Sequence, residues 1–261
     1  MIPSEPHFTL RLAADERDMK AAQRLRYEVF VEELGGDGPL VDHEARLERD
    51  EFDPMFDHLL LIDTRRDAEK LQDVVGVYRL LPSDRLLPGQ PFYSETEYDL
   101  TALKASGRKL LELGRSCVAA EYRGGTAMFH LWNALADYVL ERGIEVLFGV
   151  ASFHGTDVES LAMPLSYLHA NHLAPPELRV RAQASSYQRM DIVAPDQVDR
   201  RAAIVATPAL IKAYLRLGGF VGEGAWIDRA FNTTDVCLVM DTARMSEKHR
   251  GFYIRKHGGE A

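Results

Sequence analysis

The pattern in residues 109–151 restricts the fold of this chain more than any other: a strand, a glycine turn, a helix and a second strand follow in order. The first apolar run, Leu110–Ala120, has the length of a buried strand. Apolar residues then recur through Thr126–Arg142 at the spacing of one helix face, and a second apolar run follows at Val146–Ala151. This order predicts an α/β fold with a central mixed, twisted sheet flanked by helices.

The same patterns predict further elements. Strands are expected at Phe8–Ala13, His58–Asp63, Val74–Leu81, near Tyr187–Val193 and at Thr234–Asp241, and helices at 15–33, near 100–105, at 157–175 and at Pro208–Leu217. No repeat or linker interrupts the sequence, so we expect a single domain over residues 1–261. Within it we expect an inserted helical segment at about 155–180 and a loose C-terminal tail at about 248–261.

Charge and cysteine content exclude several classes of protein. The net charge of -9 argues against a general nucleic-acid-binding protein, which is usually basic. The two cysteines, Cys117 and Cys237, lie in apolar runs without disulfide or metal-ligand spacing, so we expect buried thiols and a reducing compartment. Neither a signal peptide nor a run of about 20 apolar residues is present. These features predict a cytoplasmic protein.

Glu112 and Arg115 place two charges inside the first apolar strand. Charges are costly to bury unless they are paired or functional. Residues three apart on a regular strand face opposite sides, but a bulge at Gly114 would bring both charges to one face and splay the strand from its neighbour. A structural ion pair in the core is the alternative interpretation.

Arg123-Gly124-Gly125-Thr126 forms the glycine turn before the helix. Backbone N–H groups at a helix start suit a phosphate. The turn is neither a Walker loop nor a dinucleotide fingerprint, and an ordinary helix cap without a ligand is the alternative.

Three further sets of residues are candidates for binding a polar substrate. Arg26 and Phe30 share a helix face at i and i+4, and Arg79 near the end of a strand can hold a carboxylate. Asp50 and Asp53 can bind an ammonium group; with no third ligand pattern nearby, we expect no metal site. Each of these residues has a plain alternative as a surface, core or loop residue.

Residues 109–151 resemble the core of the GCN5-related N-acyltransferase fold, in which a splayed strand pair holds a pantetheine arm and the following turn binds its phosphate. The turn here, Glu121-Tyr122-Arg123-Gly124-Gly125-Thr126, matches the usual Gln/Arg-x-x-Gly-x-Gly/Ala pattern in part. The phosphopantetheine of a carrier protein has one phosphate and no nucleotide, so it needs less of this loop than coenzyme A does.

A longer series of motifs narrows the resemblance. Arg26-x-x-Val29-Phe30, Asp50-x-x-Asp53, Arg79-Leu80-Leu81-Pro82 and Glu112-x-x-Arg115 occur in the order seen in acyl-homoserine-lactone synthases. The chain is more similar to the L-ornithine N-alpha-acyltransferases of ornithine-lipid synthesis, over roughly residues 8–242. The segments that carry this similarity are Leu25–Gly35, Glu112–Val118, Ala151–Asp157, Gly219–Gly224 and Asn232–Val236.

The resemblance implies a reaction. A 3-hydroxyacyl group passes from acyl carrier protein to the alpha-amine of L-ornithine by direct attack of the amine on the thioester, and lyso-ornithine lipid is formed. The acyl-phosphopantetheine of the carrier is then a co-substrate, and no permanently bound cofactor is expected. Because the product is an amphiphile, peripheral contact with the inner membrane is compatible with this expectation.

For this reaction, we hypothesise the following roles for the candidate residues. Glu112 is the expected general base and Arg115 its catalytic neighbour, with Arg115 or Arg79 holding the ornithine carboxylate. The expected substrate-binding residues are Arg26, Phe30, Asp50, Asp53, Arg79 and Phe153. The two aspartates are expected to bind the side-chain ammonium of ornithine. Val118, Arg123, Gly124, Gly125 and Thr126 are expected to bind the phosphopantetheine, and Lys104, Arg108, Lys109 and Arg123 to form a basic patch for the acidic carrier.

Three alternatives remain open at this stage. The same reaction could act on glutamine, lysine or glycine, because one acidic residue can decide an ammonium pocket. A homoserine-lactone synthase would use S-adenosylmethionine instead. A non-catalytic module that binds acyl groups or a carrier protein would not need Glu112 and Arg115 together.

Overall fold

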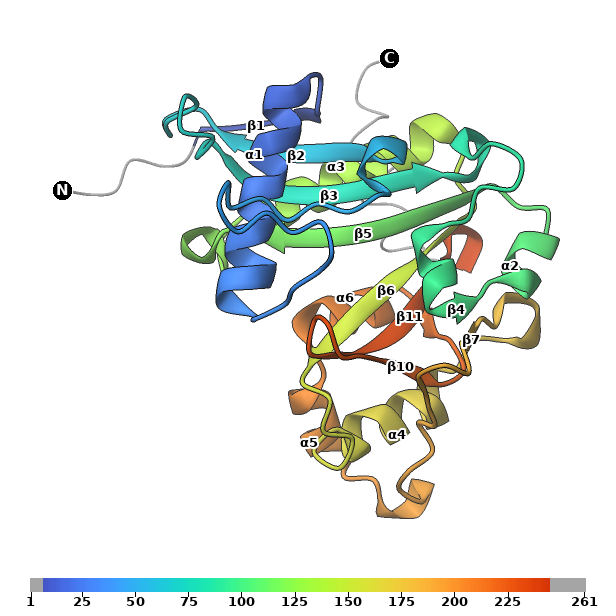
Figure 1. Cartoon of the computed structure of the whole chain (residues 1–261). Coiled ribbons are helices and arrows are strands. Elements are labelled where there is room, and N and C mark those ends of the chain that lie inside the picture. The colour runs from blue at the N-terminus through green and yellow to red at the C-terminus, as the bar shows by residue number, and fades with distance from the viewer. Residues whose placement is uncertain (1–6, 245–261) are drawn as a thin grey trace. The chain divides into compact units, whose positions relative to one another are not determined.

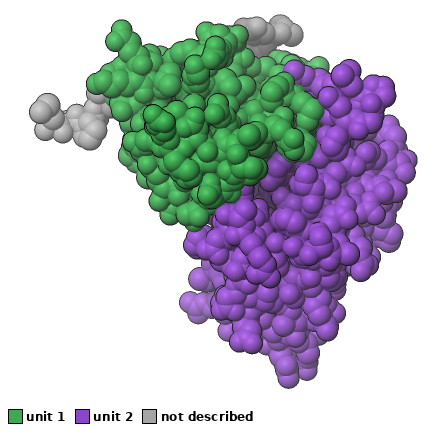
Figure 2. All heavy atoms as spheres, viewed as in Figure 1, with its two compact units in different colours: residues 1–81, 113–142 green, residues 82–112, 143–261 purple. Residues whose placement is uncertain are grey.

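The computed structural model describes residues 7–244 (Figure 1). These residues divide into two compact units, coloured green and purple in Figure 2. Among the described residues, unit 1 comprises residues 7–81 and 113–142, and unit 2 comprises residues 82–112 and 143–244.

Unit 1 is built on antiparallel strands. Its strands are β1 (Phe8–Leu12), β2 (Asp57–Asp63), β3 (Val74–Pro82) and the later part of β5 (Leu110–Val118), in the order β1-β2-β3-β5. β1 pairs with β2, and β2 with β3, in antiparallel register. Strand β3 is buried at every position, because helices cover both faces of these strands.

Two helices cover this sheet, α1 (Glu16–Arg26) on one face and α3 (Ala127–Arg142) on the other (Figure 1). Asp15 caps α1 by accepting a hydrogen bond from Asp18 N at 2.9 Å, as its position predicts. The helix continues to Glu33, as expected, but its second half, Tyr27–Glu33, is a π-helix. Such segments are rare and are frequent at functional sites.

Unit 2 contains the second group of strands. They are the start of β5, β6 (Val146–His154), β11 (Thr233–Asp241), β10 (Ala225–Asp228) and β8 (Tyr187–Gln188), in that order, with β9 (Phe220–Val221) beside β11. β5 and β6 are parallel through Leu110–Glu112, whereas β6 and β11 are antiparallel along their whole length. The sheet is therefore mixed, and the predicted fold class is confirmed. A separate short ladder joins β4 (Tyr98–Asp99) to β7 (Arg181–Ala182).

The helices of unit 2 are α2 (Thr101–Ala105), α4 (Ala162–His172), α5 (Arg200–Ala206) and α6 (Ala209–Arg216). Short 3₁₀ turns in the two units lie at Asp53–Met55, Ser83–Arg85, Tyr93–Thr96, Ala120–Tyr122, Pro176–Leu178, Pro195–Gln197 and Thr242–Arg244. Within residues 7–244, no helix combines the length and hydropathy needed to cross a bilayer.

Several boundaries differ from the expectation. The strand expected near Tyr187–Val193 is only two residues long, and α4 begins at Ala162 rather than at 157 because Asp157 instead supports a turn through Glu159 N. Helix α5 and strand β10 were not predicted. The tail expected at 248–261 lies outside the described residues.

Strand β5 is irregular beside Gly114, where the sequence predicts a bulge. Arg115, rather than Gly114, has left-handed backbone geometry with φ 48°. A side chain in this region costs about 1–2 kcal/mol, and such strain is frequent at functional sites. Gly114, Arg115 and Ser116 are half-buried, whereas the residues on both sides of them are buried.

Gly76 on β3 should be required for the contact between the sheet and α3. A Cβ atom at this position would lie 2.9 Å from Leu131 Cδ1 and 3.2 Å from Leu61 Cβ, and both leucines are fully buried. We therefore expect Gly76→Ala to lower the free energy of unfolding by about 1–3 kcal/mol in urea titrations. Gly125→Ala is the control, since its Cβ would meet only Tyr122 O at 3.6 Å. Equal stability of the two variants would contradict this packing.

Candidate active site

Three arginines from different elements of unit 1 converge on one loop. Arg26 ends α1, Arg79 lies on β3 and Arg115 on β5. The side chains of Arg26 and Arg79 are 0% exposed, and that of Arg115 is 13% exposed. Buried guanidinium groups require carboxylate partners, because their desolvation is otherwise too costly.

The loop before β2 supplies these partners. Asp53 Oδ1 accepts from Arg26 Nη1 at 2.6 Å and from Arg79 Nη1 at 2.8 Å. Asp50 accepts from Arg79 Nη1 at 2.7 Å and from Arg115 Nη2 at 3.2 Å.

Glu48 completes the arrangement. It accepts from Arg26 Nε and, at 3.2 Å, from Arg115 Nε. Each of the three carboxylates therefore binds two arginines, and each arginine binds two carboxylates. We call this closed, alternating set the arginine–carboxylate ring; its members are Arg26, Glu48, Arg115, Asp50, Arg79 and Asp53.

Further hydrogen bonds fix the loop that carries the acids. Asp50 Oδ1 accepts from Phe52 N at 3.0 Å and from Asp53 N at 3.1 Å. Gln23 Nε2 donates to Asp53 Oδ2 at 2.9 Å, and Gln23 O accepts from Glu48 N at 3.1 Å. The acids are thus held to helix α1 as well as to the arginines.

The ring keeps its carboxylates charged. Burial alone would raise the pKa of Glu48, but Arg26 and Arg115 outweigh it and lower the pKa to about 2. The pKa of Asp53 is also lowered, since Arg26 and Arg79 outweigh its burial. With three guanidinium groups against three carboxylates, the ring carries no net charge.

His58 lies opposite Arg79 in the β2–β3 register and is a neutral group. Burial and the nearby Arg26 lower its pKa to about 4. At pH 7 its Nε2–H therefore donates to Asp53 O, 3.1 Å away.

Only one side of the ring is accessible. The side chains of Arg115 and Asp50 are 13% and 18% exposed, whereas the other four members are 5% exposed or less. A substrate carboxylate or ammonium would therefore meet Arg115 or Asp50 before any other member.

Glu112 lies in unit 2 and is 1% exposed. Its Oε1 accepts from Ser94 N at 2.6 Å and its Oε2 from Tyr93 N at 2.9 Å. These donors orient the side chain, as the role of a general base requires.

The glycine turn joins β5 to α3 within unit 1. Gly124 has φ 76°, which glycine adopts without strain, and Thr126 O accepts from His130 N at 3.0 Å, so the helix starts directly after the turn. Arg123 Nε donates to Val118 O at 2.9 Å, and its Nη2 donates to Glu33 Oε2 at 2.7 Å.

The other predicted residues are more dispersed. Phe30 is half-buried in the π-helix, Phe153 is buried on β6 and Val118 is buried at the end of β5. Lys104 and Arg108 line a cavity of about 340 Å³ in unit 2.

The basic residues predicted to bind the carrier all form ion pairs. The pairs are Lys104 with Glu95 at 2.7 Å, Arg108 with Asp241 at 2.6 Å, Lys109 with Asp84 at 2.7 Å and Arg123 with Glu33 at 2.5 Å. The docking role of this patch stays a prediction.

Sequence reasoning selected five of the six ring members but missed Glu48, together with Gln23 and His58 around it. Glu48 belongs to the acidic, irregular segment before β2, where no periodicity marks a buried side chain. The three arginines that lie in buried elements were the available signal, because each of them requires an acid. Cys117, by contrast, is a buried thiol as expected, and burial raises its pKa to about 12.

The chain resembles known acyltransferases. The family described as Acetyltransferase (GNAT) domain matches residues 25–133, which include the whole ring and the glycine turn. The chain is 65% identical over 252 residues to the L-ornithine N(alpha)-acyltransferase of Rhodobacter capsulatus, covering 97% of this chain and 96% of that protein. It is 40% identical over 254 residues to the L-ornithine N(alpha)-acyltransferase of Brucella abortus, covering 97% and 89%.

Solved structures agree on the fold. FeeM, an N-acyl amino acid synthase from uncultured soil microbes, matches with a TM-score of 0.52 at 13% identity over 92% of this chain and 93% of its own. The CoA-dependent acyl-homoserine lactone synthase BjaI matches with a TM-score of 0.53 at 15% identity over 98% and 92%. The N-acyltransferase-like fold inferred from the motifs is confirmed.

Glu48→Gln should reveal how much the ring contributes to stability. The substitution leaves three guanidinium groups against two carboxylates in a buried ring, so we expect the free energy of unfolding at pH 7 to fall by about 3–5 kcal/mol. Glu44→Gln, an exposed acid of the same loop, should change it by less than about 0.5 kcal/mol.

The loss should depend on pH. The pKa of Glu48 is about 2 in the folded protein against an ordinary 4.5, so its contribution is complete above pH 4.5 and disappears as the pH falls towards 2. Urea titrations across this range should therefore show the wild type and Glu48→Gln converging. A difference that stays constant would show that the Glu48 charge does not stabilise the ring.

Proposed function

The chain belongs to the family of L-ornithine N-alpha-acyltransferases, and from this premise we propose that it transfers a 3-hydroxyacyl group from acyl carrier protein to the alpha-amine of L-ornithine. The enzyme is an N-acyltransferase, and acylation of ornithine is the first step of ornithine-lipid synthesis. The observation that carries this function is the 65% identity to the Rhodobacter capsulatus enzyme over nearly the whole of both chains.

The amine attacks the thioester carbonyl directly, and the thiol of the phosphopantetheine leaves. Because an amine is protonated at neutral pH, a base must accept a proton before the new C–N bond is complete. We assign this role to Glu112, acting directly or through a water molecule. The Tyr93 and Ser94 N–H groups that hold its carboxylate support the assignment, because they orient an acceptor without removing its charge.

The thioester oxygen becomes negatively charged during the attack. We assign its stabilisation to backbone N–H groups of β5 around Arg115, where the left-handed residue interrupts the regular strand.

The accessible side of the ring provides the carboxylate site. Arg115 is the better candidate for binding the ornithine carboxylate, because its side chain is partly exposed whereas Arg79 is fully buried. Arg26 and Arg79 then act as positioning residues, since they hold Asp50 and Asp53 in place.

The glycine turn supports a phosphopantetheine donor. Its N–H groups at the start of α3 suit a phosphate, and Gly124 and Gly125 leave the backbone open to a close approach. A carrier-bound donor and a coenzyme A donor share this chemistry, so the assay must compare them.

The direct test measures free thiol release and product mass with the purified protein. The donors are 3-hydroxyacyl carrier protein and 3-hydroxyacyl-CoA, and the acceptors are ornithine, lysine, glutamine, glycine and S-adenosylmethionine. The proposal predicts release with ornithine and the carrier-bound donor. Thiol release only with another amino acid or with S-adenosylmethionine would show that ornithine is not the acceptor. Release only with the CoA thioester would show that acyl carrier protein is not the donor.

Glu112→Gln should lower kcat by about 10²–10⁴-fold while the KM for ornithine changes little, because the amide cannot accept the proton. Thiol release under saturating substrates measures kcat, and thermal unfolding verifies that the variant is folded. Glu159→Gln, an exposed acid of unit 2, is the control and should keep near-normal turnover. Near-normal turnover of a folded Glu112→Gln variant would remove Glu112 from this role.

Carrier binding should depend on Lys104 and Lys109. Reversing both charges to Glu should raise the KM for the acidic carrier about tenfold and leave the KM for ornithine unchanged, and added salt should reduce the difference. The matched control reverses Lys20 and Lys70 of unit 1, which are also exposed and ion-paired. An unchanged KM for the carrier would show that docking occurs elsewhere.

A further inference from the structure

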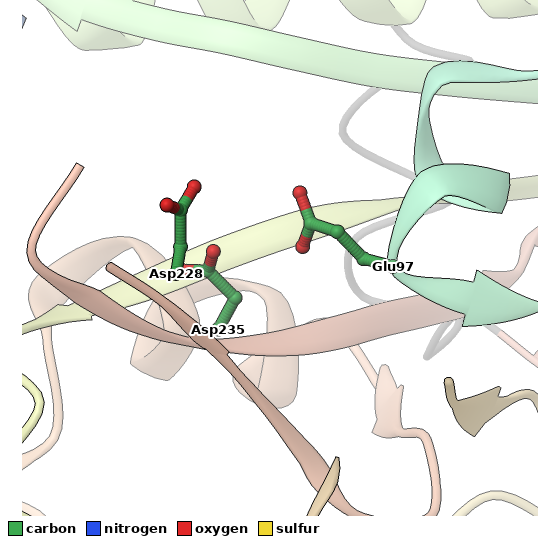
Figure 3. A group of neighbouring side chains, drawn as sticks. All are labelled: Glu97, Asp228 and Asp235. Carbon is green, nitrogen blue, oxygen red and sulfur yellow. The ribbon is translucent and has the colours of Figure 1, made fainter. Parts of the chain in front are cut away.

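Three buried carboxylates that the sequence did not single out meet in unit 2. Glu97, Asp228 and Asp235 are 2%, 9% and 3% exposed, and each offers an oxygen within 4.8 Å of the other two. Figure 3 shows Asp228 and Asp235 on the β10–β11 hairpin and Glu97 just before β4, with their carboxyl groups directed towards a common space. Three acids this close at low exposure are costly to ionise together unless a cation lies among them.

The fold sets the position of each acid. Asp228 Oδ1 accepts from Ala230 N at 2.8 Å and Phe231 N at 3.0 Å, which orients its carboxylate. The hydroxyl of Tyr98 lies 3.0 Å from Gly224 O and 2.9 Å from Asp235 O, and these two carbonyls share its proton. Tyr98, which follows Glu97, is therefore fixed to the β10–β11 hairpin. The group is therefore built in advance of any ligand.

A fourth side chain on the same face points to a ligand. Asp228 pairs with Thr233 across the hairpin, and Thr233 and Asp235 alternate onto the same face of β11. Thr233 is 8% exposed, and its buried Oγ1 has no hydrogen-bond partner among the described residues. A buried hydroxyl usually has one, so this oxygen is available to a bound group.

The same face also offers a donor. Trp226 lies opposite Asp235 in the register, and its buried Nε1–H has no acceptor within residues 7–244. A metal ion cannot accept a hydrogen bond from an N–H group. An organic ligand that carries both a cationic group and a hydrogen-bond acceptor can bind the three carboxylates, the hydroxyl and the indole N–H together. Three oxygens that each accept a hydrogen bond of about 2.8 Å from one tetrahedral ammonium nitrogen lie about 4.6 Å from one another. The oxygens of Glu97, Asp228 and Asp235 lie within 4.8 Å of one another, which fits this geometry.

We propose that Glu97, Asp228 and Asp235, with Thr233, bind the side-chain ammonium of the acceptor amino acid. This assignment rests on the proposed function and specifies which end of ornithine the site recognises. The alpha-amine must lose its proton to attack, so a group of carboxylates would oppose its activation. The delta-amine is not acylated and stays charged, so the same carboxylates stabilise it. The arginine–carboxylate ring carries no net charge, so it has no surplus negative charge for this task.

One segment connects this ammonium site with the proposed base. The 3₁₀ turn Tyr93–Thr96 supplies the two N–H donors to Glu112, and Glu97 follows it directly. Gln183 N donates to Glu97 O at 2.7 Å and anchors the end of the turn. Recognition of the ammonium and orientation of the base therefore depend on the same short stretch of backbone.

The test compares ornithine with norvaline, which has the same carbon chain without the delta-amine. We expect Asp235→Asn and Glu97→Gln each to lower kcat/KM for ornithine about 10–100-fold, and Thr233→Val by a few fold, because each removes an acceptor from a buried charge. The value for norvaline and the KM for the acyl donor should stay unchanged. Asp99→Asn, an exposed acid two residues after Glu97, is the control and should leave the ornithine-to-norvaline ratio unchanged.

Calorimetric titration of ornithine into the protein without an acyl donor separates this proposal from the reaction itself. Tighter binding of ornithine than of norvaline by the wild type but not by Asp235→Asn supports the ammonium site even if no turnover occurs. Wild-type turnover with an unchanged ornithine-to-norvaline ratio in the variants would overturn the site and leave the reaction standing. Equal losses for both amino acids would indicate a structural role, and thermal stabilisation of the wild type alone by Mg²⁺, Ca²⁺ or Mn²⁺ would indicate a metal site; either would overturn the proposal.

Discussion

Burial of positive charge is the constraint on which the first unit depends. A guanidinium that leaves water requires a carboxylate in good geometry, and the ring supplies two to each of its three arginines. The loop that carries the acids therefore has one favoured path, although it contains little regular structure. Because α1, β3 and β5 each contribute one arginine, the same ion pairs join a helix, two strands and this loop. What remains accessible is a single edge that can face a zwitterionic substrate.

The acids assigned to the site are held in three different ways, and each suits a different task. The carboxylates of the ring are neutralised by arginines, so they hold the arginines in place and add no net negative charge to the site. Glu112 is held by backbone N–H groups, which orient it while leaving it able to accept a proton. Glu97, Asp228 and Asp235 are grouped with one another, which favours a cation among them. An enzyme that acylates one amine of a diamine needs this separation, because one nitrogen must lose a proton while the other keeps its charge.

Periodicity and end signals predicted most of the long elements, including the capped first helix and the strand–turn–helix–strand at 109–151. The motifs also selected five ring members, since arginine in a buried element is itself a signal. Glu48 was missed because it lies in an irregular loop, where the sequence has no periodic pattern that would indicate which side chains are buried. A bulge was expected at Gly114, whereas the residue with left-handed backbone geometry is the neighbouring Arg115. The acid group could not be foreseen, because Glu97 and the hairpin acids are far apart in the sequence and only the fold brings them together.

The position of the acyl group on the product tests this account most directly. Tandem mass spectrometry or NMR of the product from ornithine and 3-hydroxyacyl carrier protein distinguishes the two amides. We expect acylation of the alpha-nitrogen alone, with a free delta-amine, because the carboxylates of unit 2 keep that amine charged. A product acylated on the delta-nitrogen, or a mixture of the two, would contradict it.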